Sequence, residues 1–344
     1  MCPLSIAVLS PRTATRGGLS TYLDALDAEV RDDPSVSLSF IEIPYERAML
    51  DPATAASYLA PRLGDASVIH ANDYFASTVA RRADLGIPVV TSMHLLHSAY
   101  SYAGLPIPQR EVAQLEAESA VRSDTTIAVS HWMGERALRL GTDQRRLRVI
   151  HNGMSLHVPA RCADMRPHPL ALCFSGRLVE QKGADLLLPF VRALSEYDVA
   201  WTLDICGDGP WYDRIAEGVR REGWGNRVRL TRWLDGDAMH AVFAESDMTL
   251  SFTRHEPFGL SFLESMACGT PVVGSVRDGM WDYCEAGVNA VACLSVEAVA
   301  ATVAAFADAP PLLPARETTQ ASVQQFTWRR TVEATVDVYR AVAA

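Results

Sequence analysis

Short apolar runs typical of β-strands alternate with longer helical patterns along almost the whole chain, and this alternation limits the possible folds more than any other feature. The first pair is a strand over residues 4–9 followed by a helix over 19–30. Parallel strands need long crossover connections, usually helices, so the pattern predicts parallel sheets with helices on both faces. We therefore expect an α/β protein.

The alternation stops once, at residues 153–168, which contain prolines and histidines but no clear hydrophobic period. It resumes with a strand over 170–174 and continues to a strand over 271–273. A chain of 344 residues is also long for a single core. The sequence thus predicts two doubly wound, Rossmann-like domains that face a central cleft, an N-terminal domain over 1–152 and a C-terminal domain over 168–327.

Net charge and cysteine spacing limit the possible partners and the cellular compartment of the protein. The formal net charge is −10, and its spread over both halves argues against a nucleic-acid partner. None of the seven cysteines has C-x-x-C spacing, which is typical of a reducing compartment. No stretch reaches the ~18 apolar residues that a membrane helix needs. We expect a soluble, cytoplasmic protein without a membrane span.

In doubly wound sheets, ligands bind beyond the carboxyl ends of the strands, so the loops that follow strands are the candidate sites. The first is RGGLSTY at 16–22, where Gly17 and Gly18 open a helix. Paired glycines let backbone N–H groups approach an anion at a helix N-terminus, although a plain tight turn has the same signature. The full G-x-G-x-x-G and G-x-x-x-x-G-K-[ST] patterns are absent, which disfavours a standard dinucleotide enzyme and a P-loop NTPase.

The second candidate loop is SGRLVEQKGADLL at 175–187, which follows the first strand of the C-terminal domain. Arg177 and Lys182 lie five positions apart across a turn into a helix, so both cations could reach one bound anion. Lys182 is the only lysine, since the other 30 of the 31 basic residues are arginines. A surface basic pair would give the same spacing, but chance variation in so arginine-rich a chain would favour arginine at 182.

The third candidate is RHEPFGLSFLESMACGTPVV at 254–273, in which two glutamates bracket a turn. Pro257 suits the first turn of a helix, and the N–H groups of Phe258, Gly259 and Leu260 would then be free to hold phosphate oxygens. Glu264, one turn further, could accept hydrogen bonds from a ribose, and Glu256 would point beyond the phosphates. This arrangement predicts a site for a nucleotide that carries a hydroxyl-rich group.

Taken together, the motifs resemble the GT4-type retaining glycosyltransferases, which have the GT-B fold and use nucleotide-activated sugars. The matching segments are GGLSTY, TSMH, AVS, VIHNGM, GRLVEQKG, GDGP, HEPFGLSFLE and FTWRRTVEATVDVYR. They cover nearly the whole chain in the family's order. The resemblance implies that the final helix, over 328–344, crosses back to pack on the first domain.

The resemblance also implies a role for each matching residue. Arg177 and Lys182 would neutralise the leaving diphosphate, and Glu256 would lie near the donor sugar. His94 would approach that sugar from the N-terminal domain, and Glu264 would bind the ribose. The other residues assigned to donor binding are Gly17, Gly18, Gly207, Trp233, Leu234, Phe258, Gly259 and Leu260.

The acceptor is expected to lie against the N-terminal domain, where aromatic and polar side chains suit a small polyhydroxy molecule such as a carbohydrate or cyclitol. The candidate contacts are His97, Tyr100, Tyr102, Tyr74 and Trp132, although His97 has a purely structural interpretation as well. We expect a nucleotide-diphosphate sugar as co-substrate, a UDP-sugar in preference to a GDP-sugar, and no other cofactor.

The predicted reaction is hexosyl transfer (EC 2.4) with retention of anomeric configuration. Fixed cations and N–H groups would stabilise the departing diphosphate. Because Glu256 and Glu264 would hold hydroxyl groups, neither is left to act as nucleophile or base, and attack on the face of departure remains. Asp235 and Asp237 resemble a metal-binding D-x-D, but Asp237 is expected to cap a helix, so no metal site is predicted.

Two other functions stay open at this stage. A GT-B nucleotide-sugar epimerase would use the same donor site, and so would a catalytically silent nucleotide-sugar-binding protein. A phosphorylase would need a lysine for pyridoxal phosphate, yet the sole lysine is already assigned to the diphosphate. Asp282 and Ala290 depart from the residues that are usual in the family, so the shape of the pockets near them is not given by the resemblance.

Overall fold

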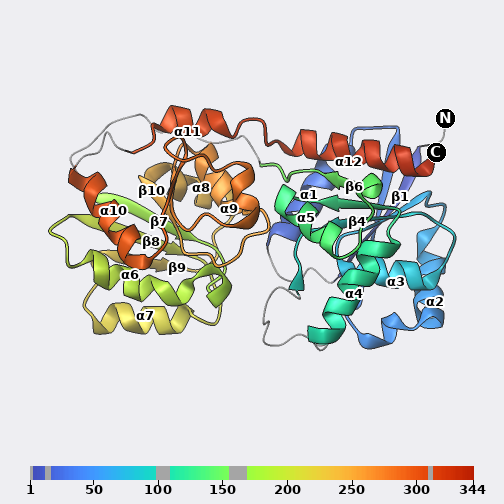
Figure 1. Ribbon diagram of the computed structural model, residues 1–344, viewed down its shortest axis with the longest axis horizontal. Helices are drawn as coiled ribbons and strands as arrows, with labels where there is room; N and C mark the ends of the chain where they lie inside the picture. Colours follow the sequence, from blue (N-terminus) through green and yellow to red (C-terminus); the bar gives the residue numbers. More distant parts are fainter. Residues whose placement is uncertain (1–2, 12–16, 98–108, 155–168, 309–312) are drawn as a thin grey trace. The chain divides into compact units, whose positions relative to one another are not determined.

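The computed structural model describes residues 3–11, 17–97, 109–154, 169–308 and 313–344. The chain divides into two compact units, the first made of Met1–Gly153 with Phe326–Ala344 and the second of Met154–Gln325. Each unit is a parallel sheet flanked by helices, so the expected α/β fold with two Rossmann-like units is confirmed (Figure 1). None of the helices in the described residues is both long and apolar enough to span a membrane.

The sheet of the first unit has, among the described residues, six parallel strands in the order β2-β1-β3-β4-β5-β6. The strands are β1 Leu4–Pro11, β2 Val36–Ile43, β3 Val68–Ala71, β4 Val89–Met93, β5 Thr125–Ala128 and β6 Leu147–Val149. The helices are α1 Gly18–Val30, η1 Arg47–Leu50, α2 Pro52–Leu63, α3 Tyr74–Ala83, α4 Gln109–Arg122, α5 His131–Arg139, η3 Gln144–Arg146 and α12 Trp328–Ala343.

Helix α2 contains two prolines, a residue type that usually breaks helices. Pro52 stands at the start of the helix, where the missing N–H would have no intrahelical partner. The Asp51 side chain accepts a hydrogen bond from the Thr54 N–H and caps that end at 2.9 Å. Pro61 lies inside the last turn. The helix then buries Leu59 and Leu63 in the core of the unit.

Helix α12 completes the first unit, although it comes from the far end of the chain. It packs against α1, β3 and β4, so the expectation that the final helix returns to the first domain is confirmed. The Tyr339 hydroxyl lies 2.6 Å from Nδ1 of His70, and the Ser92 hydroxyl lies 2.7 Å from Nε2 of the same ring. All three side chains are buried. This polar chain links α12 to two strands of the sheet.

The sheet of the second unit has, in the part of the chain that is described, six parallel strands in the order β12-β11-β10-β7-β8-β9. The strands are β7 Leu170–Ser175, β8 Trp201–Cys206, β9 Val228–Thr231, β10 Met248–Ser251, β11 Val272–Gly274 and β12 Ala290–Ala292. The helices are η4 Glu180–Lys182, η5 Ala184–Leu186, α6 Leu187–Leu194, α7 Tyr212–Arg221, α8 Gly236–Glu245, α9 Leu260–Ala267, η6 Asp278–Asp282, α10 Val296–Asp308 and α11 Arg316–Ser322.

The strand order of each sheet reverses direction at one point. In the second unit the chain runs from β7 through β8 to β9, then returns to the other side of β7 with β10. The equivalent point in the first sheet lies between β1 and β3. Loops diverge from such a switch point and leave room for a ligand at the carboxyl ends of the strands. The loops after β7 and β10 are therefore the first place to look for a site in the second unit.

Candidate functional site

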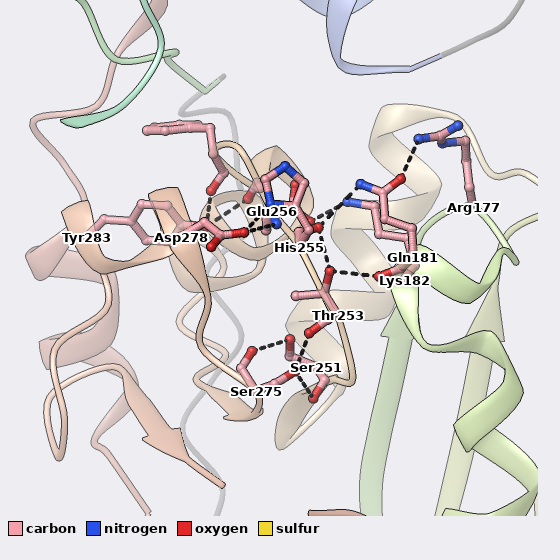
Figure 2. Close-up of polar contacts among 12 residues, drawn as sticks. Arg177, Gln181, Lys182, Ser251, Thr253, His255, Glu256, Ser275, Asp278 and Tyr283 are labelled. Atoms are coloured by element: carbon pink, nitrogen blue, oxygen red, sulfur yellow. Dashed lines mark hydrogen bonds and ion pairs between the residues drawn. The ribbon is translucent and has the colours of Figure 1, made fainter. Parts of the chain in front are cut away.

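Two loops meet at the switch point of the second sheet. Lys182 ends the short helix η4 in the loop after β7, and Glu256 lies in the loop after β10. The Lys182 ammonium pairs with the Glu256 carboxylate although the residues are 74 positions apart (Figure 2). The Glu256 side chain is 6% exposed and that of Lys182 is 20% exposed. The structure thus brings together two residues that sequence motifs had singled out separately.

Further contacts brace these two loops against each other. The Gln181 carbonyl accepts hydrogen bonds from the Arg254 N–H at 2.8 Å and from the Thr253 hydroxyl at 3.3 Å. The Arg254 guanidinium binds both carboxylate oxygens of Asp185, at 2.7 and 2.6 Å. Bidentate pairs of this kind fix orientation as well as distance. The loops therefore form one rigid support for Lys182 and Glu256.

Arg177 stands at the entrance of the same loop. Its guanidinium donates to the Gln181 side-chain oxygen at 3.4 Å and otherwise stays exposed. Figure 2 shows Arg177 and Lys182 projecting from one loop, with Gln181 between them. The loop thus carries two cations, Arg177 exposed and Lys182 paired with a carboxylate.

The turn into α9 differs from the prediction in register. The helix begins at Leu260 and Gly259 is its N-cap, so Pro257 precedes the helix rather than occupying its first turn. Gly259 has φ +92°, and a Cβ there would lie 2.7 Å from the Tyr283 hydroxyl, which donates to the Phe258 carbonyl at 2.8 Å. A left-handed glycine delays the helix start by changing the chain direction.

Two N–H groups at the start of α9 remain open to a ligand. Those of Leu260 and Ser261 have no partner among the described residues, and the buried Ser261 hydroxyl also has none there. Because the N-terminus of a helix attracts negative charge, this end of α9 can hold an anion.

Glu264 lies one turn into the same helix. It is partly buried, and burial raises the pKa of its carboxyl group to about 7. No partner of its side chain occurs among the described residues. A carboxyl group without a protein partner can accept hydrogen bonds from the hydroxyl groups of a ligand, and in its protonated form it can also donate one.

The ends of β7 and β8 close tightly at Gly207. A Cβ at this position would lie 1.9 Å from the Gly176 carbonyl oxygen, and the residue has φ +155°. After β9, the Trp233 side chain is 41% exposed and Leu234 is half-buried. Arg232, next to Trp233, binds both oxygens of Asp208 at 2.9 and 2.8 Å. These residues form one side of the carboxyl edge of the sheet.

The D-x-D segment has a structural role that differs in detail from the expectation. Asp235, not Asp237, caps α8, and its carboxylate accepts a hydrogen bond from the Ala238 N–H at 3.0 Å. Asp237 lies in the first turn, where a negative charge is favourable. The error of two positions follows from the ambiguity between the two aspartates of this segment, either of which suits a cap.

In the first unit, Gly17 and Gly18 open α1 beyond the end of β1. The Gly17 N–H donates to the Ser20 hydroxyl at 3.0 Å and is therefore engaged. The N–H groups of Gly18 and Leu19 have no partner among the described residues. An anion at this helix start would thus meet the N–H groups of Gly18 and Leu19, whereas that of Gly17 is already engaged.

His94 follows β4 in the first unit. Its ring lies 4.6 Å from the Tyr22 ring, between centroids, and its Nε2 is buried without a partner among the described residues. Burial lowers the pKa of His94 to about 4, so the imidazole is neutral at pH 7. A neutral ring with one open nitrogen can accept or donate a single hydrogen bond.

Three of the expected acceptor residues lie after neighbouring strands of the first sheet. The Tyr74 and His97 rings are 5.3 Å apart, but Tyr74 is 2% exposed and its hydroxyl contacts that of Tyr45. Trp132 is half-buried on α5, with the Arg136 guanidinium 4.9 Å above its ring. Tyr100 and Tyr102 lie outside the described residues.

Sequence reasoning missed the residues that hold the loops in place. Figure 2 shows hydrogen bonds on either side of Glu256 along the loop. Gln181 and Thr253 donate to the His255 carbonyl, and Asp278 accepts the Glu256 N–H. Tyr283 donates to the Phe258 carbonyl. Their positions follow no hydrophobic period, and their partners are distant in sequence. Only His255 could have been noticed in the sequence, because it directly precedes Glu256 in the turn motif.

Comparison with protein families agrees with this architecture. A family described as "Glycosyl transferases group 1" matches residues 166–320, and one described as "Glycosyltransferase Family 4" matches residues 16–158. The two matches together cover both units. The chain therefore belongs to the GT4-type glycosyltransferases with the GT-B fold and is a glycosyltransferase (EC 2.4).

Individual relatives have varied names. A glycogen synthase from Mycobacterium tuberculosis is 28% identical over 286 residues, covering 80% of this chain and 68% of the relative. A GDP-mannose-dependent alpha-(1-6)-phosphatidylinositol dimannoside mannosyltransferase from the same species is 29% identical over 253 residues, 70% of this chain and 65% of that protein. A D-inositol 3-phosphate glycosyltransferase from Catenulispora acidiphila is 28% identical over 321 residues, 85% and 76% of the two chains.

Solved structures share the fold over the full length. HepE from Anabaena, in complex with UDP and glucose, has a TM-score of 0.81 at 18% identity and covers 98% of this chain and 100% of its own. A sucrose-phosphate synthase from Thermosynechococcus elongatus has a TM-score of 0.82 at 19% identity and covers 98% of each chain. At such identities the similarity concerns the fold.

Proposed function

We propose that the protein is a retaining hexosyltransferase that moves a sugar from a nucleotide-diphosphate donor to a hydroxyl group of a small polyhydroxy acceptor. One observation carries the proposal. The only lysine of the chain pairs with Glu256 at a topological switch point, in loops that also carry Arg177 and the start of α9. This arrangement suits a ligand that combines negative charge with hydroxyl groups.

Each donor group has a proposed contact in the second unit. Lys182, Arg177 and the first N–H groups of α9 bind the diphosphate, and Glu256 accepts hydrogen bonds from the sugar hydroxyls. Glu264 binds the ribose, while Gly207, Trp233 and Leu234 border the base. Because Lys182 and Glu256 pair with each other, the donor must offer both a phosphate for the ammonium and hydroxyls for the carboxylate. A ligand with only one of these would leave a partly buried charge unpaired.

The reaction breaks the bond between the anomeric carbon and the diphosphate oxygen. The cations and the helix N–H groups stabilise the charge that develops on the diphosphate, an effect worth about 10² to 10³ in rate for one well-placed donor. The acceptor hydroxyl bonds to the anomeric carbon on the same face, and a diphosphate oxygen takes its proton. An α-linked donor then gives an α-linked product. We propose that no metal ion takes part.

The acceptor, on this proposal, binds to the first unit. His97, Trp132, Tyr100 and Tyr102 supply polar and aromatic contacts, and His94 hydrogen-bonds to the donor sugar through its open nitrogen. Tyr74 is too deeply buried to touch an acceptor directly. Its contribution is therefore to support the His97 ring, against which it packs.

The nature of the donor is the next part of the proposal. We favour a UDP-sugar, and the GDP-mannose-dependent relative makes GDP-sugars the first competitor. Calorimetric titration with UDP-, GDP- and ADP-sugars identifies the donor, and the coupling constant of the anomeric proton in a product formed with EDTA present tests retention and metal independence together. A β-linked product from an α-linked donor would refute same-face attack. Epimerised nucleotide sugar released without acceptor would instead support an epimerase.

A further inference from the structure

Asp278 has an unusual backbone conformation close to the candidate site. It has φ +49°, and only one other non-glycine residue in the described part of the chain, Asp84, has a positive φ. Asp84 ends helix α3, where a left-handed residue is common. Asp278 begins the short helix η6 beside Glu256. Residues other than glycine adopt this backbone conformation only where the surrounding structure requires it, and such residues cluster at functional sites.

The Asp278 side chain binds two consecutive residues of the neighbouring loop. One carboxylate oxygen, Oδ2, accepts the Glu256 N–H at 3.1 Å and also contacts Nδ1 of His255 (Figure 2). Burial lowers the pKa of His255 to about 3, so the ring is neutral and its Nδ1–H donates to the carboxylate. Asp278 thus fixes the peptide that joins His255 to Glu256.

Other groups hold the carbonyls of the same two residues. The Gly279 N–H donates to the Glu256 carbonyl at 3.0 Å. The Thr253 hydroxyl and the Gln181 side chain donate to the His255 carbonyl, at 2.9 and 3.3 Å. With the backbone tied on each side and the side chain buried, the Glu256 carboxylate has little freedom except toward Lys182. A shift of the 255–256 peptide would therefore move the carboxylate away from Lys182.

We propose that Asp278 is a positioning residue for Glu256: it holds the 255–256 peptide so that the Glu256 carboxylate meets Lys182, and His255 orients the Asp278 side chain. The catalytic consequence rests on the proposed function, whereas the geometric one does not. A purely structural turn would be better served by glycine, which adopts φ +49° without strain. The side chain at 278 is retained, on this proposal, for its contacts with the Glu256 loop.

Replacement of Asp278 by glycine separates the two explanations. Asp278→Gly relaxes the backbone and removes both side-chain contacts, while Asp278→Asn tolerates the left-handed conformation and keeps an acceptor for the Glu256 N–H. Asp84→Gly is the matched control, because it makes the same exchange at the same φ in the first unit. We expect Asp278→Gly to lower kcat by about 10²-fold with a much smaller change in KM, Asp278→Asn to recover most of the rate, and Asp84→Gly to match the wild type.

A double variant shows whether Asp278 acts through Glu256. In a Glu256→Gln background, Asp278→Gly should cost little further rate, since residues that act as a unit are not additive. Full additivity of the two losses would refute the proposed route. Wild-type kcat in Asp278→Gly would refute the positioning role altogether.

The sole lysine gives a measurement that needs no substrate. Labelling with 13Cε-lysine yields a single side-chain methylene signal, which reports the pairing of Lys182 with Glu256. We expect Asp278→Gly to shift this signal toward its position in Glu256→Gln, and Asp84→Gly to leave it in place. An unchanged signal in Asp278→Gly would overturn the inference even if the enzyme transferred sugar. If no nucleotide sugar were turned over, the same signal would still decide the geometric role.

Discussion

Removal of the Lys182 ammonium should affect catalysis and stability by separable amounts. In Lys182→Ala the diphosphate loses one fixed positive charge, and we expect kcat at saturating donor to fall by about 10² or more. The Glu256 carboxylate, 6% exposed, also loses its partner. Breaking a fully buried pair costs about 3 to 5 kcal/mol, and the 20% exposure of Lys182 places this pair lower, at about 2 to 3 kcal/mol of the free energy of unfolding.

A neutral pair distinguishes the two effects. In Lys182→Met combined with Glu256→Gln no charge is buried alone, so we expect most of the stability to return while kcat stays low. Arg192→Ala is the control for loss of a cation, because Arg192 pairs with Glu222 in an exposed ion pair, a kind that contributes little to stability. Steady-state kinetics and urea denaturation measure the two quantities. Near wild-type kcat in Lys182→Ala would show that the ammonium does not act on the leaving group.

Three further predictions concern stability. Folding raises the pKa of Glu264 from 4.5 to about 7, so the folded protein keeps a proton that the unfolded chain releases. The free energy of unfolding should therefore fall as the pH rises from about 5 to about 7. Denaturation midpoints measured across this range should show a flatter slope for Glu264→Gln. Gly207→Ala should destabilise by about 2 kcal/mol or more because its Cβ would overlap a backbone oxygen, whereas Gly225→Ala, with open space around it, should not; thermal unfolding compares them. Tyr339→Phe leaves a buried imidazole nitrogen without its partner and should cost about 1 to 3 kcal/mol, while Tyr197→Phe, 42% exposed, should be neutral; equal midpoints in urea would contradict the argument.

The order and type of most elements could be predicted from the sequence. The strand expected over 170–174 occurs within one residue of its bounds as β7, since this largely buried strand begins as an apolar run. The elements that were missed have other causes. Helix α2 carries two prolines, and α6 is preceded by the separate 3₁₀ turn η5. Hydrophobic period and proline content describe only residues that are near in sequence. The start and extent of these helices depend also on capping and on packing against the rest of the unit.

The sequence by itself determined which residues could do chemistry. A single lysine among thirty arginines, two glutamates around a Pro-Phe-Gly turn and a glycine pair before a helix are readable without coordinates, because they concern composition and short spacing. The register of α9 was not readable to the residue, since the left-handed conformation of Gly259 depends on the Tyr283 side chain that packs beside it.

Only the tertiary structure decided which of these residues meet. Lys182 and Glu256 pair because β10 returns to the side of β7, an event of chain topology that no local pattern records. Because β11 lies beside β10, Asp278, in the loop after β11, also meets Glu256 across 22 positions and contacts His255. Sequence motifs show which side chains are available. Their partners are determined by the order of the strands and by the backbone groups that packing leaves unpaired, and both arise only once the sheet has formed.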